Sequence, residues 1–131
     1  MLEGGCYCGA VRYATEDEPR NPTVCHCTDC RRVAGAASVA WFSVRRSALR
    51  WTAAEPASFR SSPAVERTFC GTCGTCLTWW GRDEAAWIDI TIASLDDPDR
   101  VPPQDHTFVG ERTDWDVIGD GLPRFERTRH G

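Results

Sequence analysis

The chain has 131 residues, 41% hydrophobic and 26% charged, with a formal net charge of −4. This length and composition predict a single globular domain over residues 1–131 and exclude wholesale disorder. The negative charge argues against nucleic acid as a partner, because phosphate contacts need a basic face. No apolar run approaches the roughly 18–20 residues of a membrane helix, so we expect no membrane partner either.

The first half of the chain reads as short strands around one helical turn. We predict a loop at residues 15–22 and a helical turn at 28–33, capped by Thr28 or Asp29 and ended at Ala34-Gly35. The predicted strands of this half cover residues 8–14, 23–27, 37–44 and 48–53.

The second half contains the clearest strand. Between residues 86 and 93, Trp87, Asp89 and Thr91 alternate with isoleucines at 88, 90 and 92, which indicates a sheet with one face in the core. Beyond Ser94 the chain is expected to form loops and a charged tail. The other strands predicted here cover residues 57–61, 65–69 and 77–80. The pattern predicts an all-β domain with at most short helical turns.

All 15 basic residues are arginine, so Schiff-base chemistry through a lysine side chain is excluded. Arginines bind carboxylates in a forked geometry and therefore suit an anionic small molecule. Residues 1–5 contain neither a basic residue nor an apolar segment. We therefore expect no secretory signal and a cytoplasmic location.

Seven of the eight cysteines fall into three short clusters, and Cys76 stands apart. In a reducing compartment, clustered cysteines more often bind metal than form disulfides. If Cys6 and Cys8, like Cys25 and Cys27, lie on extended chain, each pair presents two thiolates in one direction. Such pairs suit a tetrahedral Zn²⁺ better than a strained ring between near neighbours.

The run from Cys70 to Gly74 has the form of a zinc knuckle. A tight turn there lets backbone amides point at the sulfurs, and Gly74 can take the left-handed conformation. Together with Cys6 and Cys8, Cys70 and Cys73 complete a four-cysteine tetrahedron that closes a long loop. We therefore predict a structural zinc.

The central cluster supplies only three thiolates, from Cys25, Cys27 and Cys30. A vacant fourth position distinguishes catalytic from structural zinc. His26 lies between two cysteines of one strand face, so it is expected to point away from the metal. Cys76 either closes this site or is a small buried apolar residue. A closed site would favour a non-catalytic module that binds a partner protein.

Other candidate site residues allow two interpretations each. Arg31 and Arg32 follow the open cluster and either bind substrate carboxylates or are solvated surface charges. His106 either acts as a general acid or base or is an exposed loop histidine. Four aromatic residues at strand spacing either line a pocket or belong to the core: Trp41, Phe42, Trp79 and Trp80.

Three motifs in this order resemble the glutathione-dependent formaldehyde-activating enzyme family, which includes the centromere protein V-like domains. They are Gly4-Gly-Cys6-Tyr-Cys8-Gly-Ala-Val-Arg-Tyr13, Cys25-His-Cys27-Thr-Asp-Cys30-Arg31, and Phe69-Cys70-Gly-Thr-Cys73-Gly74. A weaker match continues through His106, Trp115 and Asp120-Gly-Leu-Pro123. The sequence departs from the family pattern at Cys76, where small uncharged residues are more usual.

The resemblance implies small coiled β-sheets around a structural zinc on Cys6, Cys8, Cys70 and Cys73. It implies a second, more labile zinc on Cys25, Cys27 and Cys30, where the thiol of glutathione would bind. The implied activity is condensation of formaldehyde with glutathione to S-(hydroxymethyl)glutathione, which is a carbon–sulfur lyase reaction in reverse. An open zinc would lower the pKa of a bound thiol and present a thiolate at neutral pH.

Overall fold

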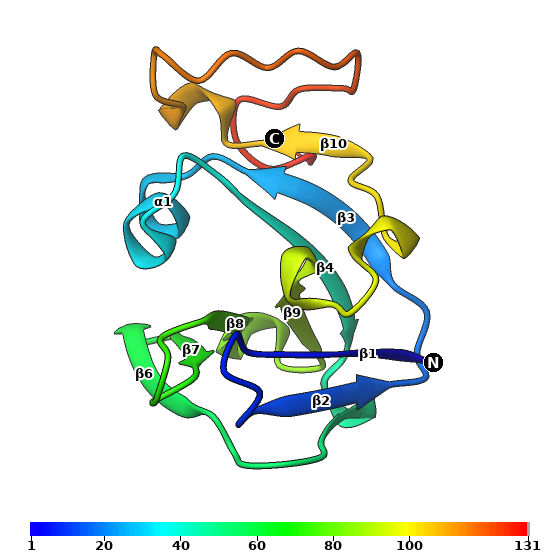
Figure 1. Cartoon of the computed structure of the whole chain (residues 1–131). Coiled ribbons are helices and arrows are strands. Elements are labelled where there is room, and N and C mark those ends of the chain that lie inside the picture. Colours follow the sequence, from blue (N-terminus) through cyan, green and yellow to red (C-terminus); the bar gives the residue numbers. More distant parts are fainter. Residues whose placement is uncertain (131) are drawn as a thin grey trace.

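The computed structural model describes residues 1–130, and their strands form two sheets (Figure 1). The smaller sheet has the strand order β1-β2-β5, with β1 at Leu2–Gly5, β2 at Arg12–Thr15 and β5 at Leu49–Trp51. The larger sheet has the order β10-β3-β4-β9-β8-β7-β6. Its strands are β3 (Arg20–Cys25), β4 (Val39–Arg45), β6 (Ala57–Ser62), β7 (Val65–Phe69), β8 (Cys76–Gly81), β9 (Trp87–Thr91) and β10 (Asp105–Thr107).

The predicted all-β class is confirmed. One α-helix, α1 (Thr28–Ala34), lies in the described part of the chain, together with short 3₁₀ turns. Strand pairs within both sheets are antiparallel, except that β10 pairs in parallel with β3. Figure 1 shows β10, near the C-terminus, lying along β3. No helix within residues 1–130 has the length and apolar character that a membrane crossing requires.

The two faces of the larger sheet bury different sets of side chains. The alternation predicted for β9 holds, and Ile88 and Ile90 are buried in the main core with Phe42 and Val44 of β4. The smaller sheet contributes Tyr13 to this core. On the opposite face, a second cluster contains three buried side chains and the side chains packed against them: Cys25, Cys30 and Trp41, with Cys27, Val39, Cys76, Trp79 and Phe108. The larger sheet therefore separates the main core from the central cysteine cluster.

Several sequence-based assignments were wrong, among them the strand predicted from Cys8, which begins only at Arg12. The first strand, β1, was not predicted, because its two glycines have little preference for strands. Residues 15–22 were predicted as a loop, but β3 begins at Arg20 and runs through Pro22 with an irregular register between Arg20 and Thr23. Such an irregularity accommodates a proline within a strand. The short parallel strand β10 follows two prolines and was predicted as loop.

Gly4 fixes the approach of β1 to the rest of the fold. A Cβ atom at this position would overlap the carbonyl oxygen of Ser94 and the ring of Tyr13. The hydroxyls of Tyr13 and Ser94 are hydrogen-bonded to each other at 2.7 Å. A glycine is therefore required where the chain enters its first cysteine pair.

Candidate metal centres

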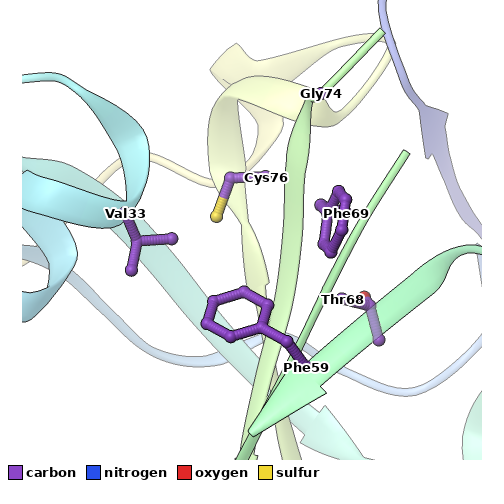
Figure 2. Close-up of a pocket in the computed structure, with 6 residues that line it drawn as sticks. All are labelled: Val33, Phe59, Thr68, Phe69, Gly74 and Cys76. Carbon is purple, nitrogen blue, oxygen red and sulfur yellow. The ribbon is translucent and has the colours of Figure 1, made fainter. Parts of the chain in front are cut away.

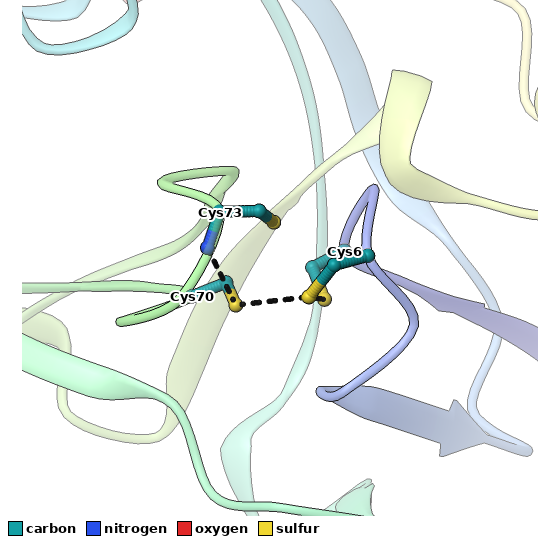
Figure 3. A group of neighbouring side chains, drawn as sticks. Cys6, Cys70 and Cys73 are labelled. Atoms are coloured by element: carbon teal, nitrogen blue, oxygen red, sulfur yellow. Dashed lines mark hydrogen bonds between the residues drawn. The ribbon is translucent and has the colours of Figure 1, made fainter.

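The two terminal cysteine pairs converge from turns at the ends of strands. Cys6 and Cys8 lie in the turn between β1 and β2, and Cys70 and Cys73 lie in the turn between β7 and β8. Their four sulfurs lie within 4.8 Å of one another. Figure 3 shows the sulfurs of Cys6 and Cys70 directed toward the same point. The first pair was predicted on an extended strand and lies instead in a turn, which nevertheless brings its sulfurs together.

The sulfur spacing of this four-cysteine centre fits Zn²⁺. The Cys6 and Cys8 sulfurs are 3.6 Å apart, and the Cys8 and Cys70 sulfurs are 3.7 Å apart. Four sulfurs placed tetrahedrally around zinc at about 2.3 Å would be separated by about 3.8 Å. The observed distances are far longer than the roughly 2.05 Å of a disulfide bond. The donor set therefore matches a closed tetrahedral site.

Backbone amides orient the sulfurs of the four-cysteine centre, as the knuckle motif predicts. The amide of Val11 donates to the Cys6 sulfur at 3.2 Å, and the amide of Cys73 donates to the Cys70 sulfur at 3.4 Å. Gly74 has φ +83° and its amide donates to the Cys70 carbonyl at 2.8 Å, which confirms its left-handed role. Hydrogen bonds from Thr75 lower the pKa of Cys73 to about 5, which favours the thiolate that a metal needs.

The central cluster forms where β3 passes into α1. Cys25 ends β3, Cys27 is the N-cap of α1 and Cys30 lies in the first turn of the helix. Their sulfurs lie within 4.8 Å of one another. The prediction that Thr28 or Asp29 caps this helix was wrong, because the Cys27 sulfur accepts the Cys30 amide at 3.3 Å. Hydrogen bonds from the Cys25 and Cys30 thiols lower the pKa of Cys27 to about 2 and favour its thiolate.

Only these three donor atoms converge at the second centre among residues 1–130. Neither His26 nor Cys76 belongs to the converging set. Cys76 packs against the cluster from β8, and burial raises the pKa of its thiol. The arrangement thus has the donor set of a three-ligand metal site.

His26 belongs to a buried chain of hydrogen bonds beside this centre. Its Nε2 atom is 2.9 Å from Nδ1 of His106, whose Nε2 atom is 3.0 Å from both carboxylate oxygens of Asp120. Because the carboxylate can only accept, His106 donates to Asp120 and accepts from His26. The remaining ring nitrogen of His26 is buried without a hydrogen bond, 3.6 Å from Asp116. The sequence predicted neither this contact nor the burial of His106.

A cavity of about 270 Å³ opens beside the second centre (Figure 2). It is lined by Val33 of α1 and, across from it, by Phe59, Thr68, Phe69, Gly74 and Cys76. The Cys76 sulfur points between Val33 and Phe59. Neither Arg31 nor Arg32 lines this cavity, although the half-buried Arg31 follows Cys30 directly.

The four aromatic candidates divide between the two faces of the larger sheet. Phe42 and Trp80 pack in the main core, and Arg46 lies 4.0 Å from the centre of the Trp80 ring. Trp41 and Trp79 pack around the central cysteines instead. The core interpretation therefore holds for one pair, while the other pair forms the apolar surroundings of the second centre.

Sequence reasoning missed one charged residue near this centre. Arg67 of β7 is only 3% exposed, and its Nη1 atom is buried without a hydrogen-bond partner. One feature of the sequence could have indicated its burial. Arg67 is two residues from Val65 and two from Phe69 in β7, so strand alternation places it on the same face as these two apolar side chains.

The comparisons with known proteins agree with the cysteine geometry. The family model "Glutathione-dependent formaldehyde-activating enzyme" matches residues 1–111. A relative from Halomonas elongata named "Putative glutathione-dependent formaldehyde-activating enzyme" is 33% identical over 128 residues, which cover 88% of this chain and 79% of the relative. A crystal structure of a Rhodobacter sphaeroides protein shares the fold, with a TM-score of 0.65 and 20% identity over 94% of this chain and 98% of the other. The chain belongs to the glutathione-dependent formaldehyde-activating enzyme family.

Proposed function

We propose that this enzyme forms or cleaves the S-hydroxymethyl adduct of a small thiol such as glutathione, and thus acts as a zinc-dependent carbon–sulfur lyase. The observation that carries this proposal is the set of three convergent thiols at Cys25, Cys27 and Cys30, without a fourth protein donor among the described residues. The names of the family and of the Halomonas elongata relative support glutathione and formaldehyde as substrates.

The proposal assigns two Zn²⁺ ions to each chain. Cys6, Cys8, Cys70 and Cys73 would hold a structural ion, and the three central cysteines would hold a more labile one that is partly lost on purification. At the second site, bound Zn²⁺ would lower the pKa of a substrate thiol, so that a thiolate is available at neutral pH. A reducing compartment such as the cytoplasm is part of the proposal, because the cysteines must remain free thiols.

The reaction itself conserves its atoms without a further reagent. The thiolate sulfur attacks the carbon of formaldehyde, a carbon–sulfur bond forms, and the π bond of the carbonyl group breaks. The oxygen then takes a proton in place of the one that the thiol lost. Holding both reactants together converts a bimolecular addition into a positioned one.

Two further residues contribute to the proposal. Arg31 is half-buried directly after Cys30, from where it would bind a substrate carboxylate. His106 was considered as a general acid or base, but both of its ring nitrogens are engaged by His26 and Asp120. We therefore assign it the role of fixing the turn that contains His26, between Cys25 and Cys27.

The alternative function is a non-catalytic interaction module in which both zincs are structural. The packing of Cys76 against the central cluster favours this alternative, because a modest shift would offer a fourth thiolate. A Cys76→Ser variant separates the two functions. The enzyme proposal predicts that this variant retains two zincs with unchanged affinity, whereas the module predicts a weakened second zinc.

The test of the enzyme proposal is the rate of exchange between formaldehyde, glutathione and their adduct, followed by NMR at equilibrium. Because this reaction also proceeds uncatalysed, samples without protein and with free Zn²⁺ provide the baseline. Wild-type protein should accelerate exchange, and Cys27→Ser, shown to be folded, should not. Exchange at the baseline rate with both zincs present in the wild type would refute the proposed reaction.

A further inference from the structure

Arg67 is a buried cation with unsatisfied bonding capacity. Its Nε atom donates to the hydroxyl of Ser61 at 3.3 Å, but its Nη1 atom is buried and has no hydrogen-bond partner. No carboxylate within residues 1–130 forms an ion pair with it. A buried charge without a partner is costly, so such a group points to an anion that the protein receives at this position.

The strand register places Arg67 on the face that carries the second centre. Arg67 lies opposite Trp79, and Phe69, two residues farther along β7 and beyond a register irregularity after Thr68, lies opposite Cys76. Residues opposite one another, and residues two apart on one strand, share a face of the sheet. Trp79 and Cys76 both pack against the buried cluster of Cys25, Cys30 and Trp41. The guanidinium therefore lies on the face of the sheet that carries the second centre.

The charge at this centre is complementary to Arg67. Three thiolates exceed the charge of a divalent cation by one, and a fourth thiolate would raise the excess to two. In a poorly solvated setting such an excess is unfavourable unless a cation lies nearby. The half-buried Asp89 on the same face is hydrogen-bonded to Ser43 at 2.6 Å and forms no ion pair with Arg67.

We propose that Arg67 is the residue by which the second centre selects an anionic ligand, the thiolate sulfur of its substrate, over a neutral one. It does so as the fixed counter-charge of the three-cysteine cluster and does not bind the substrate's carboxylate. The near-complete burial of its guanidinium favours an effect of charge over docking of a bulky group. This inference rests on the proposed binding of a thiol at the second centre, but not on any reaction with formaldehyde.

The test measures ligand selection without turnover. The probe is Co²⁺ loaded at the second centre, and its visible absorption reports binding of 2-mercaptoethanol, which binds as a thiolate, or of neutral imidazole. Arg67→Gln retains hydrogen-bond donors without the charge, and Arg67→Lys retains the charge. Arg60→Met is the matched control, because Arg60 is exposed on the neighbouring strand β6.

We expect Arg67→Gln to weaken 2-mercaptoethanol binding roughly tenfold or more relative to imidazole. Arg67→Lys should recover most of the selectivity, and Arg60→Met should match the wild type. Equal losses for both ligands in Arg67→Gln, or no loss, would overturn the inference. If Arg67→Gln does not fold, Arg67→Lys still tests the inference. A loss of the wild-type selectivity in this variant, which keeps the charge, would overturn it. The two proposals can fail separately. If Arg67→Gln changes ligand selectivity as expected but the wild-type protein does not accelerate formaldehyde exchange, only the proposed reaction is refuted.

As a second arm, 3-mercaptopropionate is compared with 3-mercaptopropan-1-ol, two thiols that differ in a carboxylate. The inference predicts that Arg67→Gln weakens both thiols by the same factor. A loss confined to 3-mercaptopropionate would show that Arg67 binds a carboxylate instead and would overturn the role of counter-charge.

Discussion

Replacing one cysteine in each centre should have unequal effects on the fold. Cys73→Ser and Cys27→Ser form a matched pair, because both residues are half-buried and both substitutions change only the sulfur atom. Cys73 belongs to the centre that joins two turns far apart in sequence, and Cys27 belongs to a centre built within a single strand-to-helix junction. The first variant should therefore lose much more stability than the second.

The size of the difference follows from chain entropy. Cys8 and Cys70 are 62 residues apart, and closing a loop of this length stabilises the fold by about 4 kcal/mol. The cluster from Cys25 to Cys30 closes a loop of only six residues, which corresponds to about 2 kcal/mol. A domain of this size has a stability of about 5–15 kcal/mol. The melting temperature should fall by roughly 15 °C for Cys73→Ser and by roughly half as much for Cys27→Ser.

Thermal unfolding followed by circular dichroism, with zinc content measured on the same samples, provides the assay. Cys27→Ser should retain one zinc and a cooperative transition, whereas Cys73→Ser should lose the structural zinc and unfold at much lower temperature. If Cys27→Ser loses the fold while Cys73→Ser keeps it, the assignment of the two centres is reversed.

Three further variants test the surroundings of the centres. His106→Ala removes the hydrogen bond to His26 and should destabilise the fold by about 2–4 kcal/mol in urea unfolding, whereas an unchanged midpoint would contradict the buried chain. Gly4→Ala creates an overlap with the Ser94 carbonyl and should cost about 1–3 kcal/mol by the same method; a neutral result would disprove the close approach. Burial raises the pKa of Asp89 to about 6, so the stability present below about pH 4 is lost as the pH rises through 6. Asp89→Asn should therefore stabilise the fold by up to about 3 kcal/mol at pH 7.5 and by less at pH 5, and a gain independent of pH would refute this reasoning.

The sequence identified both groups of converging cysteines, because short spacings constrain sulfur positions under several backbone geometries. Cys6 and Cys8 were expected on a strand and lie in a turn, yet only Tyr7 separates them in either case and their sulfurs still converge. The alternation of β9 was equally robust, because Ile88 and Ile90 at period two lie on one face of a strand; Ile92, also buried, already belongs to the 3₁₀ turn that follows.

Features that depend on long-range contacts could not be predicted. His26 and His106 are 80 residues apart and meet only because β10 pairs with β3. This three-residue parallel strand has no local signal that distinguishes it from loop. Arg67 was missed for a related reason, because a charged residue in a strand is usually directed at solvent.

The most direct test of the account is to remove zinc stepwise from the wild-type protein with a chelator. Exchange of formaldehyde with glutathione and circular dichroism are measured at each step. We predict that loss of the first equivalent of zinc abolishes the acceleration of exchange while the spectrum stays native, and that returning zinc restores the rate. Acceleration that persists until the second zinc leaves and the fold is lost would contradict a catalytic centre at Cys25, Cys27 and Cys30.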